Sequence, residues 1–192
     1  AIGPLPERLR KSVLQMAVEG KLVPQDPSEE PASVLLDRIR EERAHLIKEK
    51  KIKAPKGGES MIYLGSDGSR YEKRSKGEPV CIDDEIPFDI PEGWEWARLG
   101  NIVYQRAQLK PTSAFSYIDI GSIDNAHQRL SSKETLIEAD KAPSRARKPV
   151  KLGDVLYSTV RPYLHNMCIV DRKFSLPPIA STGFAAMVCL DG

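Results

Sequence analysis

Two stretches in the second half of the chain carry side chains that could bind nucleic acid. The first, KAPSRARKPVK, runs from Lys141 to Lys151 and holds five cations and no acidic residue. The second, STVRPYLHN, runs from Ser158 to Asn166 and combines hydroxyl, guanidinium, imidazole and amide groups. Cations neutralise phosphates, whereas planar donors such as arginine and asparagine hydrogen-bond to base edges. These residue types would therefore suit contact with DNA.

The candidate DNA-binding side chains fall into three groups along the sequence. The groups are Lys141, Arg145, Arg147, Lys148 and Lys151; Ser158, Thr159, Arg161, Tyr163, His165 and Asn166; and, as a weaker set, Arg106 and Lys110. Arg161 has the geometry to bind guanine, and Asn166 to bind adenine. Two alternatives stay open: the basic stretch is a solvated loop between prolines, or Arg161 and Tyr163 brace the turn that Pro162 fixes.

No catalytic pattern accompanies these groups. The sequence lacks a G-x-x-x-x-G-K-[ST] phosphate loop, the N-P-P-[YF] loop of an adenine methyltransferase and a deaminase H-x-E…C-x-x-C pattern. His45, His127 and His165 do not have metal-ligand spacing. Asp119 and Asp124 flank a short loop, but strand alternation directs Asp119 to solvent. We therefore expect neither catalytic residues nor a bound metal.

The bulk composition sets broad limits on the class of protein. Residues 94–192 hold 13 Lys+Arg against 9 Asp+Glu, whereas residues 1–93 hold 16 against 18. A mildly basic second half permits contact with phosphates without requiring it. The three cysteines are far apart and form no C-x-x-C, which favours a reducing compartment. With no membrane-spanning apolar run and no signal-peptide core, we expect a cytoplasmic protein without a membrane partner.

The pattern of apolar residues predicts helices first and strands afterwards. One helix is expected over Glu7–Glu19, capped by Gly20, and a second from Glu29–Pro31, with Ser28 as its cap, to about Lys50. Residues 57–80 read as a flexible linker or a small hairpin. Strands are expected over Trp94–Leu99, Ile102–Arg106, Phe115–Ile120, Val155–Val160, Met167–Val170 and Gly183–Leu190, with a helical turn near Glu138–Ala142. The predicted fold class is α+β: amphipathic N-terminal helices followed by a β-rich domain.

Both expected helices carry an apolar face that could contact a partner. In the first, Leu9, Val13 and Met16 share one face. In the second, Leu36, Ile39, Arg43 and Leu46 follow a heptad spacing that arginine interrupts. This spacing is typical of a coiled-coil seam for another helix, but it equally suits a helix that packs on its own domain. Two heptads alone are too short to be stable.

Three stretches together resemble a known family. They are LRKSVLQMAVEGKLVPQDPSEEPASVLLDRIREER (Leu9–Arg43), CIDDEIPFDIPEGWEWARLG (Cys81–Gly100) and GDVLYSTVRPYLHNMCIV (Gly153–Val170). In this order they resemble the helical region and first target recognition domain of the specificity subunit of a type I restriction-modification system. The resemblance spans nearly the whole chain apart from residues 1–6.

The resemblance implies a non-catalytic subunit that recognises double-stranded DNA. On this reading residues 1–56 form a docking and spacer region, residues 57–80 the linker or hairpin, and residues 81–192 the target recognition domain. The helical faces would dock methyltransferase (modification) subunits, and a motor-nuclease (restriction) subunit would join indirectly. The chain itself would need no cofactor, since S-adenosylmethionine, ATP and Mg²⁺ would belong to the partner subunits. Family members usually continue after the last strand through helices that complete the domain, and they carry a second recognition domain, so we expect the domain here to be incomplete at its C-terminal end.

Two other functions remain as alternatives at this point. A metal-dependent nuclease would use Asp119 and Asp124. A protein-interaction scaffold would use the helices alone and leave the basic stretch as ordinary surface.

Overall fold

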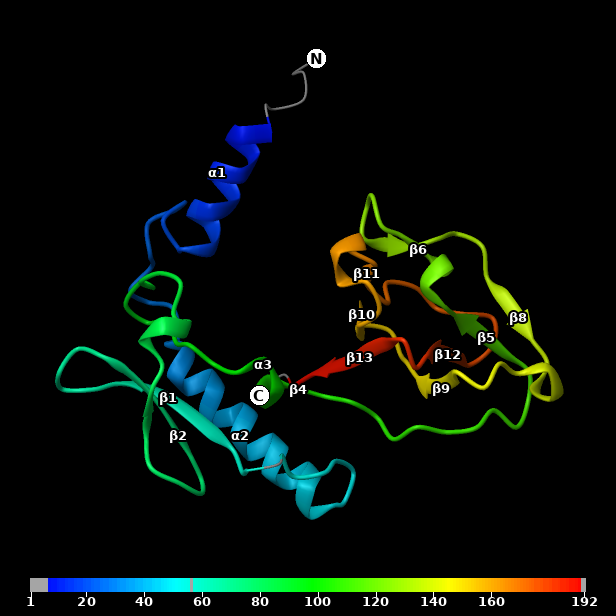
Figure 1. The fold of residues 1–192 in the computed structure, drawn as a ribbon, viewed down its shortest axis with the longest axis horizontal. Coiled ribbons are helices and arrows are strands. Elements are labelled where there is room, and N and C mark those ends of the chain that lie inside the picture. Colours follow the sequence, from blue (N-terminus) through cyan, green and yellow to red (C-terminus); the bar gives the residue numbers. More distant parts are fainter. Residues whose placement is uncertain (1–6, 56, 191–192) are drawn as a thin grey trace. The chain divides into compact units, whose positions relative to one another are not determined.

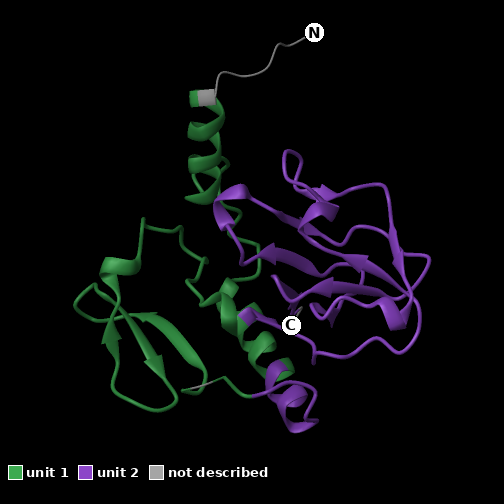
Figure 2. Cartoon of the chain, turned by 45° about the vertical axis from the view of Figure 1, so that its right-hand side comes forward, with its two compact units in different colours: residues 1–42, 54–101, 192 green, residues 43–53, 102–191 purple. Residues whose placement is uncertain are grey.

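The computed structural model describes residues 7–55 and 57–190 and has an α+β fold, as the sequence predicts (Figure 1). The chain divides into two compact units (Figure 2). The described parts of unit 1 are residues 7–42, 54–55 and 57–101, and those of unit 2 are residues 43–53 and 102–190. The predicted boundary at residue 81 falls inside unit 1. The predicted segments also include residues 1–6, 56 and 191–192, which lie outside the described residues.

Unit 1 combines two helices with a small antiparallel sheet. Its helices are α1 (Glu7–Val18) and α2 (Ala32–Lys48), the second of which continues into unit 2. Its strands are β1 (Ser60–Leu64), β2 (Arg70–Arg74) and β3 (Val80–Cys81), in the order β1-β2-β3. A 3₁₀ turn, η1 (Asp83–Glu85), follows, and the short helix α3 (Leu99–Ile102) leads out of the unit. The small hairpin predicted within residues 57–80 is confirmed, with a third strand added to it.

The end of α1 is fixed by the glycine that the sequence marks as its cap. Gly20 has φ +68°, and the N–H groups of Gly20 and Lys21 donate to the carbonyls of Ala17 and Met16. These two bonds satisfy carbonyls that the end of a helix leaves without partners. A Cβ at Gly20 would meet Pro91 Cγ at 2.5 Å and Trp94 Cζ2 at 3.3 Å. The cap is therefore also a close contact between the N-terminal helix and the Pro91–Trp94 corner.

The predicted strand over Trp94–Leu99 is wrong, because this segment is irregular up to α3. The reason is tertiary contact at its start. The Trp94 indole N–H donates to Gln25 Oε1 at 2.9 Å, and the carbonyl of Gly93 accepts from Ala32 N at 2.8 Å. Ser28 likewise does not cap α2, since its N–H and hydroxyl both donate to Asp26. The alternating residues 94–99 therefore do not pair with a neighbouring strand. They follow a corner of the chain, Gly93–Trp94, that packs on the helical region.

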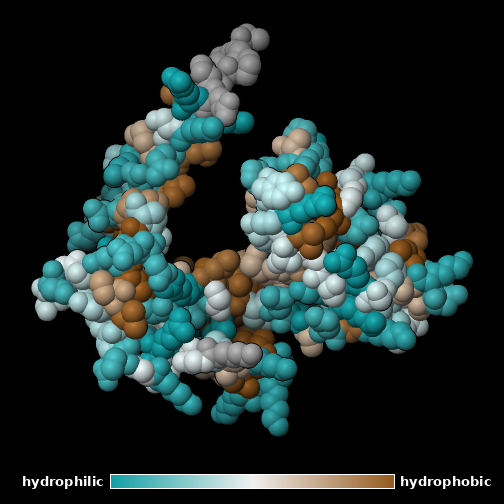
Figure 3. Space-filling model, viewed as in Figure 1, coloured by the Kyte–Doolittle hydropathy of each residue, from teal (hydrophilic) through white to brown (hydrophobic). Residues whose placement is uncertain are grey.

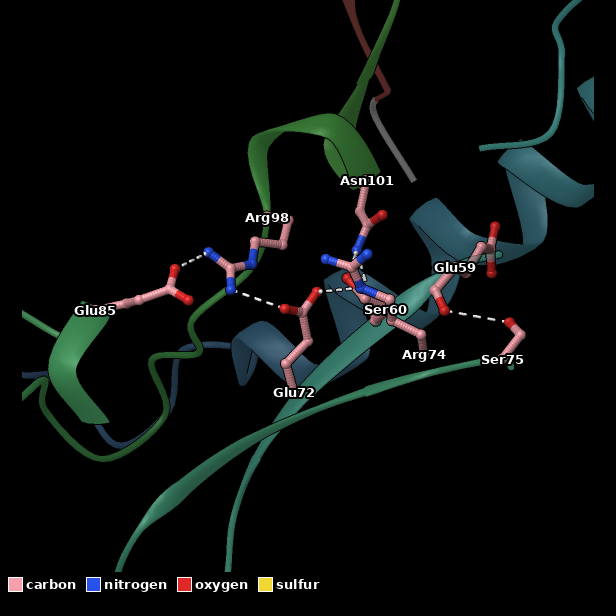
Figure 4. A network of polar contacts seen from close by, with 8 residues as sticks. All are labelled: Glu59, Ser60, Glu72, Arg74, Ser75, Glu85, Arg98 and Asn101. Atoms are coloured by element: carbon pink, nitrogen blue, oxygen red, sulfur yellow. Dashed lines mark hydrogen bonds and ion pairs between the residues drawn. The ribbon is translucent and has the colours of Figure 1, made fainter. Parts of the chain in front are cut away.

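A charged network joins the sheet of unit 1 to the residues that leave it (Figure 4). Arg98 donates to Glu72 on β2 at 2.8 Å and to Glu85 on η1 at 2.5 Å. Asn101 donates to the carbonyl and hydroxyl of Ser60 on β1. Glu72 is buried, and the bond from Arg98 lowers the pKa of its carboxyl. The carboxylate is therefore compensated by a guanidinium rather than by solvent.

Unit 2 is built from short strands in two four-stranded sheets and one hairpin. One sheet has the order β11-β10-β13-β4 and the other β8-β5-β12-β9, and β6 pairs with β7. The strand bounds are β4 (Val103–Tyr104), β5 (Phe115–Ile118), β6 (Ile123–Asp124), β7 (Arg129–Leu130), β8 (Thr135–Ile137), β9 (Ala146–Pro149), β10 (Val155–Ser158), β11 (Met167–Ile169), β12 (Pro178–Ser181) and β13 (Phe184–Cys189). Between them lie the 3₁₀ turns η2 (Ile120–Ser122), η3 (Ala139–Lys141) and η4 (Pro162–Leu164).

The two larger sheets enclose one apolar core. Leu156 and Phe184 from the first sheet and Ile118 and Ala180 from the second belong to the same buried cluster. Phe184 and Ala186 are buried while Ala185 and Met187 are half-buried, which is the alternation of a strand with one covered face. The covered faces of β10, β13, β5 and β12 thus fix the loops at the strand ends.

One part of the basic stretch is a strand rather than the predicted loop. Residues Ala146–Pro149 form β9, which pairs antiparallel with β12 and lies at the edge of its sheet. An edge position tolerates Pro149, since one side of the strand needs no ladder bond. The helical turn predicted near residues 138–142 is confirmed as η3.

Replacing Gly20 by alanine should destabilise unit 1 more than the backbone strain alone requires. An alanine in the left-handed region costs about 1–2 kcal/mol, and the added Cβ would also meet Pro91. Urea unfolding followed by tryptophan fluorescence measures this, because both tryptophans lie in unit 1. Gly68→Ala is the matched control, since Gly68 has φ +86° and nothing within 4 Å of an added Cβ. Equal losses in the two variants would contradict the contact between Gly20 and Pro91.

Removing the Arg98 guanidinium should destabilise unit 1 near neutral pH and matter little in acid. Arg98→Ala leaves the buried Glu72 carboxylate without its strongest partner, a cost on the order of 2 kcal/mol at pH 7. Because folding lowers the pKa of Glu72, the stabilisation is present above the ordinary value of 4.5 and fades as pH falls through the lower folded pKa.

The same unfolding experiment, repeated at several pH values, tests this dependence. Arg74→Ala is the control, since Arg74 contacts the same carboxylate at 3.4 Å but is more exposed than Arg98. That variant should lose no more than about 0.5 kcal/mol. An Arg98→Ala penalty that stays constant from pH 7 to acid would show that Glu72 is not its source.

Candidate nucleic-acid interface

A turn between β12 and β13 brings the two predicted stretches together. Thr182 N donates to the carbonyl of Arg145 at 2.8 Å, at the start of β9. On the other side, the carbonyl of Gly183 accepts from Thr159 N at 2.9 Å and from the Thr159 hydroxyl at 3.0 Å. The basic stretch and the loop after β10 therefore flank one turn, although twelve residues lie between Arg145 and Ser158 in the sequence.

The basic stretch divides into residues that serve the fold and residues that face solvent. The Lys148 ammonium donates to Gln105 Oε1 at 3.0 Å and to the carbonyl of Phe184 at 2.5 Å, and burial lowers its pKa. Arg147 is half-buried and its Nε donates to the carbonyl of Ser144. Lys141, Arg145 and Lys151 are exposed. The exposed three could meet a phosphate backbone, whereas Lys148 joins the edge strand β9 to β13.

The loop between β10 and β11 presents side chains from an unusual backbone. Arg161 and His165 have left-handed φ values of 52° and 53°, and η4 lies between them. Tyr163 is 69% exposed at the tip. Ser158 and Asn166 at the base of the loop are buried, and the Ser158 hydroxyl donates to the carbonyl of Val160. The loop thus projects arginine, tyrosine and histidine while its ends are held inside the unit.

Arg106, in the weaker set, forms an ion pair with Asp154. Asp154 is buried, and its carboxylate also accepts from Lys151 N at 2.7 Å. The pair therefore holds the turn that leads into β10. Lys110, in contrast, is exposed after the segment that runs beside β9, where Leu109 N donates to the carbonyl of Arg147.

The predicted side chains separate into two sets by burial and bonding. Those that face solvent with no side-chain hydrogen bond to another described residue are Lys110, Lys141, Arg145, Lys151, Arg161, Tyr163 and His165. Those that are buried or bonded inside unit 2 are Arg106, Arg147, Lys148, Ser158, Thr159 and Asn166. For Arg161 and Tyr163, burial and bonding favour the exposed alternative over the brace.

A neighbouring hairpin adds side chains that the sequence did not single out. The turn between β6 and β7 carries His127 and Gln128, and Arg129 begins β7. Asn125 Nδ2 in the same turn donates to the carbonyl of Leu164 at 3.2 Å. This bond places the hairpin beside the β10–β11 loop, at one end of unit 2 (Figure 1). The only signal in the sequence is the short, mostly polar run after Asp124, which equally suits any surface turn.

The surface formed by these two loops is mixed in character. Brown and teal side chains alternate over β6, β10 and β11 (Figure 3). Val160 and Leu164 are about 40% exposed among the polar residues. Polar side chains on such a surface can hydrogen-bond to base edges, and apolar ones can contact thymine methyl groups.

The two aspartates suggested for a metal are bonded to other groups. Asp119 caps η2 together with Ser122. Asp124 accepts from His127 Nδ1 at 2.8 Å, and this bond lowers the pKa of Asp124. Within residues 7–55 and 57–190, no group of three or more His, Cys, Asp or Glu side chains could hold a metal ion.

The predicted docking faces differ between the two helices. On α1, Leu9, Val13 and Met16 are exposed, and apolar side chains follow the helix (Figure 3). On α2, Ile39 and Arg43 are buried, and Leu36 and Leu46 are half-buried. Burial within the chain favours the alternative in which α2 packs on its own protein. Among the described helices none is long and apolar enough to cross a membrane.

About half of the chain is similar in sequence to curated proteins. Over 96 residues, 50% of the chain, it is 47% identical to the Type I restriction enzyme EcoAI specificity subunit of Escherichia coli. The resemblance inferred from the sequence is confirmed over half of the chain. The EcoEI specificity subunit of the same species is 42% identical over 97 residues. These matches span 13% of the length of each relative.

The chain was also compared with solved structures and with protein-family models. A crystal structure of the HsdS subunit from Thermoanaerobacter tengcongensis is 36% identical, with a TM-score of 0.49, over 54% of this chain and 27% of that chain. No protein-family model matches the chain.

The contacts of Arg106 predict a role in stability rather than in binding. Arg106→Ala leaves Asp154 buried without its guanidinium, which should cost about 3 kcal/mol in the free energy of unfolding of unit 2. Hydrogen exchange of the β10 and β11 amides measures the loss. Lys110→Ala is the control and should change stability by less than about 0.5 kcal/mol. If Arg106→Ala kept full stability and only weakened DNA binding, Arg106 would belong to the interface.

Proposed function

We propose that this chain recognises double-stranded DNA sequence-specifically, as part of the specificity subunit of a type I restriction-modification system. The observation that carries the proposal is 47% identity over half of the chain to the EcoAI specificity subunit. The exposed cations and planar donors of unit 2 support it, because such groups can contact phosphates and base edges. Unit 2 would be the DNA-contacting part of the target recognition domain.

The subunit would direct the chemistry of other subunits without performing it. Methylation of adenine with S-adenosylmethionine would belong to the methyltransferase subunits, and ATP and Mg²⁺ to the motor-nuclease subunit. This chain would therefore need no cofactor of its own and would act in the cytoplasm.

The exposed face of α1 is the proposed docking surface for a methyltransferase subunit. Leu9, Val13 and Met16 lie four and three residues apart, and each is at least 37% exposed. A helix this short needs tertiary packing to be stable, so an apolar face in water favours a partner.

Charge reversal in the basic stretch tests the DNA-binding half of the proposal. Lys141→Glu with Arg145→Glu changes two exposed cations and leaves the bonded Lys148 in place. We expect at least a tenfold loss of duplex retention at ~150 mM salt, because two phosphate contacts become repulsive. Retention is measured with a randomised duplex pool in the presence of the methyltransferase subunits, and enriched sequences are read afterwards.

Three controls separate this proposal from its rivals. Lys133→Glu reverses an exposed lysine outside the basic stretch and should retain most of the binding. Pull-down of the methyltransferase subunits should be unchanged by Lys141→Glu with Arg145→Glu and lost in Val13→Asp. Methyltransferase association without any DNA retention by the unmodified chain would point to a scaffold. Metal-dependent nicking of the duplex would point to a nuclease.

A further inference from the structure

The tip of the β6–β7 hairpin, residues 124–129, and the loop after β10, residues 159–165, lie side by side and are termed here the loop pair. Asn125 Nδ2 bonds to the carbonyl of Leu164 at 3.2 Å, and Gln128 Nε2 donates to the carbonyl of Asn125 at 2.6 Å. The amides of the first loop are thus used to fix its own shape and its contact with the second. The side chains that stay exposed on the two loops are therefore held by one hydrogen-bonded framework.

Backbone strain is concentrated in this loop pair. In the described part of the chain, four non-glycine residues have positive φ: Lys50, Gln128, Arg161 and His165. Three of the four lie in the loop pair, and Lys50 follows the end of α2. Histidine, like asparagine and aspartate, adopts this region relatively often, whereas Gln128 and Arg161 are of types that seldom do. Strained backbone of this kind persists where the surrounding structure enforces it, and it gathers at functional sites.

The residue types of the loop pair differ from those of the basic stretch. The loop pair contains Arg129, Arg161, His127, His165 and Tyr163, but no lysine. The basic stretch supplies three lysines among its five cations. Lysine is a flexible point charge that suits phosphate, whereas the rigid fork of arginine matches the hydrogen-bonding edge of guanine.

The electrostatics of the loop pair also favour contact with bases. The Asp124 carboxylate accepts a hydrogen bond from His127 Nδ1 at 2.8 Å and forms an ion pair with Arg129 Nε at 3.6 Å. The Arg129 side chain nevertheless remains 63% exposed. An exposed arginine partly held by a carboxylate is pre-oriented, which reduces the conformational entropy lost when it binds.

From these observations we propose a division of roles, which rests on the proposed recognition of DNA. The loop pair reads base edges in a groove, with Arg129 and Arg161 as the principal donors. Lys141, Arg145 and Lys151 hold the phosphate backbone. The left-handed backbone at Arg161 and His165 directs their side chains outward, while Thr159 anchors the loop to the β12–β13 turn.

Substitutions that keep charge and change geometry test this division. Arg129→Lys and Arg161→Lys retain the cation but lose the fork, so each should lower the preference for the selected motif about tenfold. The dependence of binding on salt should stay as in the unmodified chain. Lys141→Ala with Lys151→Ala should preserve the motif, weaken binding to all duplexes and lower the magnitude of the salt slope by about 2.

The experiment uses the whole chain with the methyltransferase subunits, selection from the randomised duplex pool, and affinity measured from about 50 to 200 mM salt. Lys133→Ala serves as the control for loss of a lysine elsewhere on unit 2. An unchanged motif in Arg129→Lys and Arg161→Lys, or a changed motif in the double lysine variant, would overturn the division. Retention without enrichment by the unmodified chain would overturn base reading and leave DNA binding intact. Absence of retention would overturn the proposed function itself.

Discussion

The turn from Ser181 to Phe184 is the constraint on which the arrangement of unit 2 depends. Here the chain passes from the sheet that contains β12 to the sheet that contains β13, so both sheets are fixed at one point. Its backbone bonds to Arg145 on one side and to Thr159 on the other, and the carbonyl of Phe184 accepts from Lys148. Any displacement of this turn would move the basic stretch and the β10–β11 loop together.

This constraint explains why the cations of unit 2 have unequal roles. Next to the buried core, a cation is retained only with partners that offset its lost hydration. Lys148 and Arg106 meet this condition, through carbonyl and amide oxygens and through Asp154 respectively. Farther from the core, Lys141 and Arg145 remain hydrated and able to exchange water and counterions for phosphate. The basic composition of this half of the chain therefore overstates the positive surface that a duplex would meet.

The sequence predicted those parts of the fold whose causes are local. The apolar spacing of α1, its glycine cap and the apolar strand within residues 183–190 depend on near neighbours and were predicted correctly. The segment Trp94–Leu99 alternates apolar and polar residues as a strand would, yet Gln25 and Gly20, about seventy residues earlier, determine its conformation. β9 was missed for a related reason, because Pro149 argues against a strand unless the strand lies at a sheet edge. Edge position is a property of topology, which composition does not encode.

The candidate site shows the same limit more sharply. Residue type identified the arginines and lysines that could meet DNA, but it did not distinguish the bonded Arg106 from the exposed Arg161. Residue type also did not single out Arg129, because a short polar hairpin becomes a candidate for binding only when another loop is found beside it. Left-handed backbone at Arg161, immediately before Pro162, is unfavourable for the isolated segment and is imposed by the folded unit. The proposed recognition surface is therefore a product of long-range contact, and its specificity would change with the support of the loops as much as with the residues they display.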